Sequence, residues 1–560
     1  MWSYRTIPPV SLIGAYLLAS GRVAQWFRQP GFFTAFAALW AAQTSAWLVW
    51  AVILYPKFFS PLIGLPEPAT GNSWFMGQWK AIIKFPTGTP MIKWINSIPN
   101  DGIIRYLGPF NQERLLITSP KALAEVLTTK NYDFVKPRQL RYSLGRILGI
   151  GLLLAEGDEH KMQRKNLMPA FSFRHIKDLY PVFWSKAREG VQAMTEEVRE
   201  KATAQQSSDE KDTAVIEASN WASRITLDII GVAGMGRDFE AIKNPGNRLT
   251  QAYNRVFKPS RQAQILQLLG LIISPRLLSW LPLQRNKDLD AAAAMIRAEC
   301  AGLIQEKKQK LAQKELDDVD ILSVALTSGG FSDSNLIDQL MTFLAAGHET
   351  TASALTWAVY LLAKHPEIQS RLRAEIRANL PPVGTPSDDS TVSSIDIDRL
   401  AYLNAVCNEV LRYFPPAPLT LRRAACDTTL LGHRVPKGTQ IMLVPWAINK
   451  SVHMWGEDAH KFNPDRWMPK EGDDKEKRAN SGGATSNYAF LTFLHGPRSC
   501  IGQAFAKAEF ACLLAAWVGR FSMELHNKED EDESKLQIKG GVTARPANGM
   551  HIRATVVEGW

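Results

Sequence analysis

The sequence is poor in cysteine and lacks short motifs that mark several common protein classes. Five cysteines are scattered through 560 residues and none belongs to a CxxC pair, which argues against a disulfide framework or a structural zinc site and favours a reducing compartment. No GxGxxG follows a predicted strand, so no dinucleotide-binding segment is expected. With 46% hydrophobic and 21% charged residues, disordered, collagen-like and low-complexity classes are excluded as well.

Negative charge is in the minority. The 54 Asp and Glu residues are outnumbered by 65 Lys and Arg residues, a formal net charge of +11. Such an excess suits a nucleic acid, a membrane surface or an acidic protein partner, and composition does not choose among them. The acidic run at 528–535 is predicted to be a solvated loop.

Charge is absent altogether from residues 32–55. This segment also lacks proline and is long enough to cross a hydrocarbon core of about 30 Å as a helix, so it is predicted to span a membrane. Its length and its tryptophans argue against a cleaved signal peptide. A shorter apolar run at 10–20 is either interfacial or the first arm of a hairpin. Lysines after the span favour a cytoplasmic position for the rest of the chain: Lys57, Lys80 and Lys84.

The rest of the chain is predicted to be one large domain behind a stiff tether. Prolines interrupt residues 56–73 and prevent both helix and central strand there. The membrane anchor is therefore assigned to 1–55 and the domain to 74–560. Within this domain, three polar insertions are predicted to be surface loops: 205–213, 381–394 and 470–486.

Helical periodicity dominates the domain. A repeat of 3.6 residues predicts long helices, among them 286–311 and 332–364. Short strands are predicted at 103–107, 114–119, 439–446 and 550–557. We therefore expect a mainly α fold with small β-sheets, of the α+β class. The apolar stretch 265–283 contains prolines and forms either two short pieces at a membrane surface or a buried helix pair.

The strongest local pattern surrounds Cys500, where residues 493–502 read FLHGPRSCIG before an apolar helical segment. A cysteine in a turn ahead of a helix faces the N–H groups of the helix N-terminus, which stabilise a thiolate as a metal ligand or a nucleophile. Gly496 and Gly502 would let the backbone approach a large flat group. Phe493 can pack beside the sulfur, and Arg498 offers a cation for a carboxylate.

A second pattern, AGHETT, lies at 346–351 in the middle of a predicted helix. An acid beside an alcohol is costly to bury there, and Gly347 costs up to about 1 kcal/mol of helix propensity. Glu349 and Thr350 therefore invite a functional explanation, although a satisfied core threonine beside an exposed glutamate would produce the same pattern. Thr350 can bond back to the carbonyl one turn earlier.

A third pattern brings opposite charges together. Glu409 and Arg412 are three residues apart in the predicted helix that Pro415 terminates, so they share a face and can pair. Arg466, in the segment FNPDRW, supplies a second guanidinium.

Together these segments resemble the cytochrome P450 family. The Cys500 segment has all five fixed positions of the family's cysteine-ligand signature, Phe-x-x-Gly-x-Arg-x-Cys-x-Gly. Glu349, Glu409, Arg466 and Cys500 also occur in the family's order, with gaps of 60, 57 and 34 residues. The chain is identified as similar to membrane-anchored, microsomal-type members, most of all those with biosynthetic roles in filamentous fungi, from about residue 65 to the C-terminus.

The resemblance implies a cofactor and its contacts. Cys500 would be the axial ligand of the iron of haem b, iron protoporphyrin IX. His160 and Arg164 correspond to a Trp and Arg pair that the family directs at a haem propionate; an imidazole can still donate a hydrogen bond to a carboxylate. Arg422 aligns with a further propionate ligand, and Arg423 is the alternative. Other residues implied at the cofactor are Arg498, Phe493, Gly502 and Gly347.

The resemblance also implies roles in proton transfer and folding. Thr350 would steer protons and water toward the site of oxygen activation, and Glu349 would relay protons. Glu409, Arg412 and Arg466 would form a structural cluster that locks the chain behind the haem.

The implied activity is that of a haem-thiolate monooxygenase. It would insert one atom of O2 into a lipophilic small molecule, by hydroxylation, epoxidation or multistep oxidation, in secondary-metabolite biosynthesis. Substrate is expected at 136–150, 261–285 and, after Pro416, 417–421. Two other classes would keep Cys500, namely a haem-thiolate isomerase, dehydratase or peroxygenase and a non-catalytic haem sensor. Glu349 and Thr350 argue for the monooxygenase.

The resemblance implies partners and a location too. Electrons are expected from NADPH through a separate cytochrome P450 reductase, with cytochrome b5 as a second candidate donor. A basic surface around Lys161, Arg164 and Lys165 would attract an acidic reductase, and no nucleic-acid partner is expected. The implied location is the endoplasmic reticulum membrane, with the catalytic domain facing the cytoplasm.

Overall fold

The computed structural model describes most of the chain, with gaps. It covers residues 6–20, 31–83, 88–204, 212–257, 262, 265–266, 269–270, 273–315, 319–383, 391–469, 475–539 and 542–560. Lys84 and parts of the three predicted surface loops lie outside the described residues.

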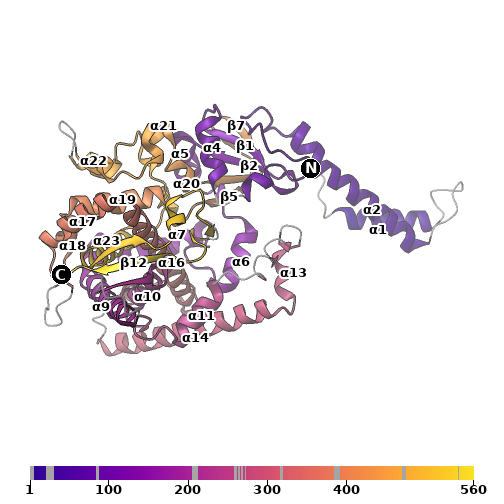
Figure 1. The fold of residues 1–560 in the computed structure, drawn as a ribbon. Coiled ribbons are helices and arrows are strands. Elements are labelled where there is room, and N and C mark those ends of the chain that lie inside the picture. Colours follow the sequence, from indigo (N-terminus) through magenta and orange to yellow (C-terminus); the bar gives the residue numbers. More distant parts are fainter. Residues whose placement is uncertain are drawn as a thin grey trace.

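Two N-terminal helices lie side by side and extend away from the rest of the molecule (Figure 1). They are α1 (Ile7–Ala19) and α2 (Phe32–Val49), and α2 continues into the π-helical segment η2 (Trp50–Phe59). Ser11 of α1 donates to Gln43 Oε1 of α2 at 3.4 Å, so the shorter apolar run packs against the longer one. Within the described residues, one helix, Phe32–Phe59, is long and apolar enough to cross a membrane, with a mean hydropathy of 1.5.

The helix extends past the predicted start of the tether. The sequence predicts that Pro56 ends it, but helical structure continues to Phe59 and extended backbone begins at Ser60. In an α-helix the proline ring clashes with the carbonyl four residues earlier. The wider π turn of η2 does not need that i→i−4 bond, which accounts for a proline inside the helix.

Helices form most of the body, as predicted. Their bounds are α3 (Trp79–Ile82), α4 (Thr89–Ser97), α5 (Pro120–Ala124), α6 (Arg138–Leu148), α7 (Gly157–Leu167), α8 (Phe173–Lys177), α9 (Tyr180–Ala204), α10 (Ala218–Ile229), α11 (Arg248–Phe257), α13 (Pro275–Trp280), α14 (Gln284–Gln313), α15 (Ile321–Ser328), α16 (Asp333–Lys364), α17 (Pro366–Asn379), α18 (Ser394–Asp398), α19 (Ala401–Tyr413), α20 (Pro445–Ile448), α21 (Val452–Trp455), α22 (Lys475–Ser481) and α23 (Gln503–Arg520). The predicted helices 286–311 and 332–364 correspond to α14 and α16.

The strands are short and form small sheets, which confirms the α+β prediction. They are β1 (Ile103–Leu107), β2 (Glu113–Ile117), β3 (Phe134–Val135), β4 (Thr213–Glu217), β5 (Thr420–Ala424), β6 (Thr428–Leu430), β7 (His433–Val435), β8 (Gln440–Leu443), β9 (Phe521–Leu525), β10 (Ile538–Lys539), β11 (Arg545–Pro546) and β12 (His551–Val556). The largest sheet has the order β1-β2-β8-β5-β3, in which β2 and β8 are parallel and the other pairs antiparallel. A second sheet has the order β4-β12-β9, and β6-β7 and β10-β11 are two-stranded.

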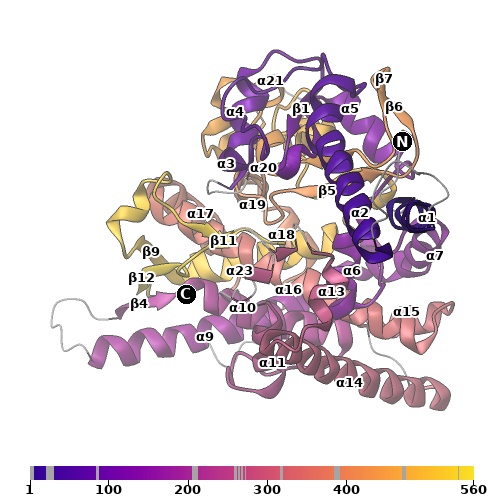
Figure 2. The ribbon, with the colours of Figure 1, turned by 90° about the vertical axis from the view of Figure 1, so that its right-hand side faces the viewer.

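The core surrounds α16, which lies in the middle of the body (Figure 2). The helix begins where Ser332 Oγ accepts from the N–H of Asn335 at 3.2 Å, and it ends ahead of Pro366, which starts α17. Every residue of α16 from Thr351 to Leu362 is buried, with α10, α14 and α23 packed against the helix. A helix that is buried on every side over this length is the signature of a central core helix.

Two predicted surface features differ in the structure. In the stretch 265–283, α13 exposes Leu277 and Trp280 at 56% and 81%, so the alternative of a buried helix pair is wrong for this described part. The acidic run 528–535 is only partly solvated, because Tyr413 Oη donates to Glu533 Oε2 at 2.9 Å and Lys364 pairs with the same carboxylate. The run therefore packs on α16 and α19. The sequence did not predict these contacts, because charge composition carries no information about specific partners.

Candidate active site

The loop before α23 is shaped by Gly496 and presents Cys500. The short helix η10 (Gly496–Arg498) begins with a φ of +74° at Gly496, and a Cβ added there would lie 2.2 Å from the carbonyl oxygen of Leu127. The chain's own packing therefore requires this glycine. The N–H of Cys500 then donates to the carbonyl oxygen of Phe493 at 2.8 Å, which closes the loop.

Gly502 differs from Gly496. It has a φ of −87°, and an added Cβ would meet only Phe171, at an ordinary 3.7 Å. The described protein atoms thus leave room at Gly502 that a side chain would occupy. The approach of a flat group to the backbone at Gly502 stays a prediction.

The Cys500 side chain is exposed, yet burial still dominates its electrostatics. Burial among the surrounding protein raises the pKa of the Cys500 thiol, while the N–H of Gly502 and the charge of Arg164 lower it. A residue that has accessible surface and is still surrounded by protein atoms is expected where a side chain faces a concave part of the surface. A helix N-terminus and a nearby cation are the two features that favour a thiolate.

A cluster of buried basic groups lies near this loop. We call it the cation cluster; its members are Lys136, His160, Arg422 and Arg498, and all are at most 9% exposed. Burial and the charge of Arg422 lower the pKa of Lys136 to about 7, and burial and the charge of Arg498 lower that of Arg422 to about 10. Burial, followed by the charges of Arg498 and Lys136, lowers the pKa of His160 to about 4.

Too little negative charge faces the cation cluster. Among the described residues, only Glu156 pairs with it: Arg498 Nη2 contacts Glu156 Oε2, and Lys136 Nζ lies 3.9 Å from Oε1. Arg498 Nε and His160 Nδ1 are buried and have no hydrogen-bond partner in the part of the chain that the structure describes. Buried cations in excess of buried carboxylates are unfavourable unless an anion joins them.

Arg164 and Arg423 both donate to backbone carbonyl oxygens, and the charge of Arg164 also reaches His160 of the cation cluster. Arg164 Nη1 donates to the carbonyl oxygen of Ser499 at 2.7 Å, so α7 is fastened directly beside Cys500. On β5, Arg423 donates to the carbonyl oxygen of Gly438 at 3.1 Å, whereas the charge of Arg422 is felt by Lys136 and His160. Of the two registers considered, the structure therefore brings Arg422 to the cluster.

The acid and alcohol of α16 have separate surroundings. Thr350 Oγ1 donates to the carbonyl oxygen of Ala346 at 2.7 Å, the bond expected from the sequence, although α16 stays helical through it. Glu349 is held from outside α16: Thr543 Oγ1 donates to its Oε2 at 3.3 Å, and Arg545 Nη1 lies 3.4 Å from its Oε1.

Gly347 has a packing explanation of its own. An added Cβ would lie 2.9 Å from Cδ1 of Ile230, which belongs to the π-helical segment η6 (Ile230–Gly234) packed against α16. The glycine thus permits a close approach of α16 to η6.

Glu409, Arg412 and Arg466 form one fully buried network. Arg412 binds Glu409 in a bidentate manner, at 2.8 and 2.7 Å, and Arg466 Nε donates to Glu409 Oε1 at 3.1 Å. Trp467 Nε1 donates to Glu409 Oε2 at 2.9 Å. Arg412 also donates to carbonyl oxygens of the downstream chain, at Asn449, Ala459 and Lys461. Every charge in the network is satisfied, as a buried ion pair requires.

Sequence reasoning missed several site residues. Glu156 and Lys136 carry no motif, and their pairing is visible only in three dimensions. Arg545 and Thr543 lie in the C-terminal segment, some 194 residues from Glu349 in the case of Thr543. The one sequence feature that could have drawn attention to Glu156 is its position directly before the helix that begins at Gly157.

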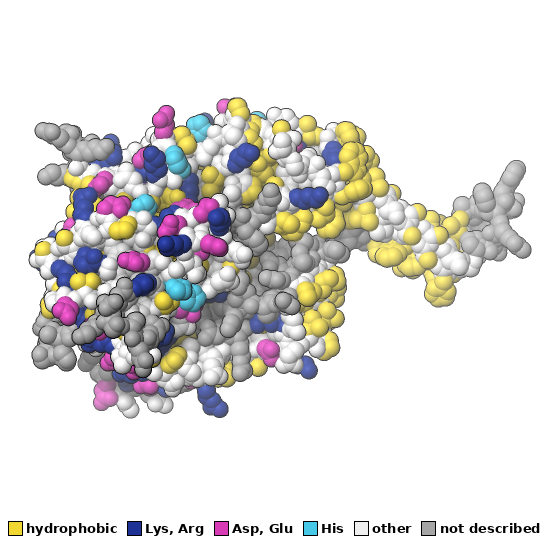
Figure 3. Space-filling view, in the orientation of Figure 1, with side chains coloured by type: hydrophobic (Ala, Val, Ile, Leu, Met, Phe, Trp, Pro, Cys, Tyr) yellow, Lys and Arg dark blue, Asp and Glu magenta, His cyan; other side chains and the backbone are white. Residues whose placement is uncertain are grey.

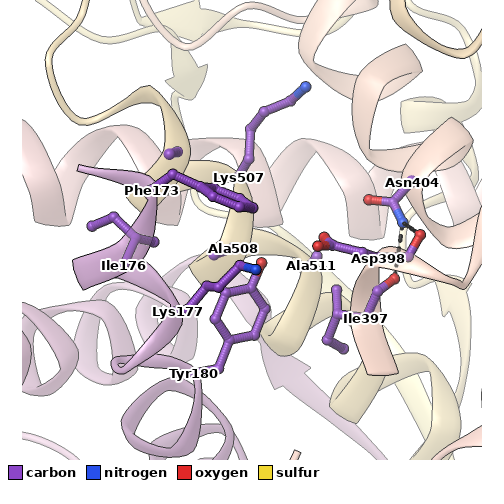
Figure 4. A pocket seen from close by; sticks show the side chains of 11 residues that line it. Phe173, Ile176, Lys177, Tyr180, Ile397, Asp398, Asn404, Lys507, Ala508 and Ala511 are labelled. Atoms are coloured by element: carbon purple, nitrogen blue, oxygen red, sulfur yellow. Dashed lines mark hydrogen bonds between the residues drawn. The ribbon is translucent and has the colours of Figure 1, made fainter. Parts of the chain in front are cut away.

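A small pocket of about 180 Å³ lies elsewhere, between α8, α18 and α23 (Figure 4). It contains none of the predicted site residues. Lys507 extends away from Asp398 and Asn404, and the Asn404 amide already donates to carbonyl oxygens, among them that of Ile397 at 2.9 Å. This pocket therefore lies apart from the predicted site.

Comparisons with known proteins identify the family of the chain. The family model described as "Cytochrome P450" matches residues 68–552. The chain is 48% identical to Cytochrome P450 monooxygenase sphH of Aspergillus fumigatus, with 94% of each chain covered. It is 48% identical to Cytochrome P450 monooxygenase FUM15 of Gibberella moniliformis, with 90% of each covered. It is 38% identical to Cytochrome P450 monooxygenase buaD of Petromyces alliaceus, with 99% of this chain and 100% of the relative covered.

Proposed function

The chain belongs to the cytochrome P450 family, and from that premise we propose that it inserts one atom of O2 into a lipophilic small molecule by hydroxylation, epoxidation or multistep oxidation. It is a cytochrome P450 monooxygenase, and its cofactor is haem. The likeness to fungal monooxygenases supports a step in secondary metabolism. The observation that carries the proposal is the exposed Cys500 thiol ahead of α23, together with a cluster of buried basic groups that has too few carboxylates.

The residues of the site fit haem b. Its propionates are the anions that the cation cluster lacks, and the unpartnered nitrogens of Arg498 and His160 are donors for them. Arg422 would be a further donor. The open side of Gly502 would suit a flat macrocycle, Cys500 would supply the thiolate to its iron, and Phe493 is the proposed packing partner of that thiolate. The fit rests on the donor set and on the space at Gly502.

The role proposed for Arg164 is electrostatic. Its guanidinium bonds the residue before Cys500 and lowers the pKa of the thiol, so it favours the thiolate form. When bound, the haem supplies the oxygen activation, and a thiolate ligand favours O–O cleavage.

We propose that Thr350 and Glu349 handle protons. Thr350 Oγ1 uses its own proton to bond Ala346, so its lone pairs remain to accept a bond from a water and orient it. Glu349 carries the titratable proton one residue away. Glu409, Arg412 and Arg466 take no part in chemistry in this proposal; they hold the chain that precedes the Cys500 loop.

Electrons would come from NADPH through a separate cytochrome P450 reductase, with cytochrome b5 as a second candidate donor. Arg164 is engaged with Ser499, so the proposed basic docking surface uses exposed cations of α7 and α8, namely Lys165, Arg174 and Lys177. Charge attraction of this kind weakens with salt. If Lys165→Glu with Lys177→Glu left reductase-driven reduction unchanged, this surface would not be the docking site.

We propose that the apolar N-terminal segment anchors the enzyme in the endoplasmic reticulum membrane and that the haem domain 74–560 faces the cytoplasm. The predicted tether 56–73 is not free of the body, because Leu62 is buried in the core and the N–H of Arg105 donates to the carbonyl oxygen of Pro66 at 2.9 Å. The apolar helix 32–59 supports an anchor.

The proposed substrate contacts, at 417–421 and in the described parts of 136–150 and 261–285, would then receive lipophilic molecules from the bilayer. Protease treatment of sealed microsomes should degrade the haem domain; protection would place it in the lumen.

The decisive experiment is a carbon monoxide difference spectrum of the dithionite-reduced protein. A thiolate-ligated haem gives a band at about 450 nm. Cys500→Ser should abolish that band, whereas Cys426→Ser, at another exposed cysteine, should retain it. A wild-type protein that binds haem without the band would contradict the proposal.

A further inference from the structure

Three consecutive residues near the C-terminus cross α16 beside its acid and alcohol. We call Thr543, Ala544 and Arg545 the C-terminal strap. Ala544 is its fixed point, because the Ala544 carbonyl oxygen accepts from Ser353 Oγ at 2.7 Å and from Trp357 Nε1 at 2.9 Å. Both donors are buried on α16, so the strap is fastened to the central helix of the fold.

The residues on either side of Ala544 hold Glu349. Thr543 supplies a hydrogen bond to Oε2 and Arg545 a charge to Oε1, so each carboxylate oxygen has its own partner. At 3.3 and 3.4 Å both contacts are long, and Arg545 is 39% exposed while Glu349 is 11% exposed. Such contacts add little to stability, but together they determine where the carboxylate points.

The C-terminal strap also binds the chain that follows α19. The N–H of Ala544 donates to the carbonyl oxygen of Pro416 at 2.8 Å, directly before the segment 417–421. We propose that the strap is a positioning device: Arg545 and Thr543 aim Glu349, and Ala544 ties that acid to the substrate-lining segment. This inference rests on the proposed monooxygenase function.

The charge on Glu349 depends on the strap. Burial raises the pKa of Glu349, and Arg545 and then Thr543 lower it. Its neighbour His348 brings no competing charge, because burial and the charge of Arg545 lower the pKa of that imidazole to about 3. Removal of Arg545 would therefore raise the pKa of Glu349 further.

The test measures this ionisation in the haem-loaded, full-length protein and needs no substrate. Thermal unfolding is followed from about pH 5 to about pH 8 for wild type, Arg545→Gln, Glu349→Gln and the double variant. A carboxyl with a raised folded pKa contributes stability that is lost as pH rises through that pKa. The loss should extend to higher pH in Arg545→Gln, and Arg545→Lys should keep the wild-type profile.

The Glu349→Gln background separates positioning from ordinary structural support. There, Arg545→Gln should leave the pH profile unchanged; the same shift in both backgrounds would overturn the proposal. Arg434→Gln, in an exposed pair 3.7 Å from Asp427, is the control and should leave the pH profile of thermal unfolding unchanged.

Amide exchange at 417–421 should be about fivefold faster in the double variant Thr543→Ala with Ala544→Pro, because the proline lacks the N–H that donates to Pro416. Unaltered exchange would overturn the tie to the substrate-lining segment.

The carbon monoxide spectrum distinguishes the two failures. A wild-type protein without the band at about 450 nm would overturn the proposed function. An intact band combined with an unaltered pH profile in Arg545→Gln would overturn the C-terminal strap alone.

Discussion

At the scale of single residues, Glu509 is a buried carboxyl group outside the proposed proton path. It lies on α23, is 1% exposed, and neither of its carboxylate oxygens has a hydrogen-bond partner among the described residues. Burial raises its pKa well above the usual 4.5, and the nearby Thr351 hydroxyl opposes this only in part. The carboxyl is therefore held in its neutral form over a wider pH range than an exposed one.

Glu509→Gln should stabilise the protein at neutral pH. Because the folded pKa is raised, the wild type loses stability as pH rises from about 4.5 through the folded pKa, and glutamine does not ionise. We expect equal melting temperatures near pH 4 and an advantage for the variant on the order of 1 kcal/mol at pH 7. Glu524→Gln, at an exposed position on β9, is the control. Parallel melting curves for Glu509→Gln and wild type would contradict this account.

Arg164→Gln should weaken thiolate ligation without loss of the fold. The substitution removes a charge that lowers the pKa of the Cys500 thiol, so that pKa rises and the ligand is protonated at a higher pH. In a pH titration of the carbon monoxide complex, the band at about 450 nm should disappear at higher pH than in wild type. Arg423→Gln, on a guanidinium bound to Gly438, should behave as wild type. An identical titration for Arg164→Gln would assign Arg164 a structural role only.

At the scale of elements, local rules predicted what short-range geometry determines. The turn at Cys500, the back-bond of Thr350 and the pairing of Glu409 with Arg412 all depend on residues within a few positions of one another. The contacts of Glu156 with Arg498 and of Arg545 with Glu349 join distant segments, and periodicity holds no information about them. Pro56 was mispredicted for another reason, because a π-helical turn tolerates a proline that an α-helix rejects.

The Glu409 network joins α19 to the chain before the Cys500 loop, so its loss should unfold the region as a unit. Arg412→Ala leaves the fully buried Glu409 carboxylate short of its bidentate partner, and we expect a loss of about 3–5 kcal/mol in the free energy of unfolding. Arg399→Ala, at an exposed pair with Asp396, should cost less than about 1 kcal/mol. Denaturant titration measures the free energy of unfolding of both variants. Equal losses in Arg412→Ala and Arg399→Ala would mean that the Glu409 network contributes no more to stability than an exposed ion pair.

At the scale of the whole molecule, one side is apolar. Figures 1 and 2 place α13 on the side from which α2 leaves the body, and Figure 3 shows hydrophobic side chains gathered there. Large exposed apolar residues occur at the base of the anchor, among them Phe59 and Trp74, and on α13, among them Leu277 and Trp280. Such patches on a soluble body mark contact with a partner or a membrane, and the direction of the anchor favours the membrane.

This arrangement predicts that Trp280 is immersed when the full-length protein is in vesicles. Lipids brominated along the acyl chain quench tryptophans that reach the hydrocarbon, so Trp280→Phe should remove a quenched component of the emission. Trp455→Phe, at a tryptophan 5% exposed within the body, should remove only an unquenched component. If Trp280→Phe left the quenched fraction unchanged, α13 would lie clear of the bilayer.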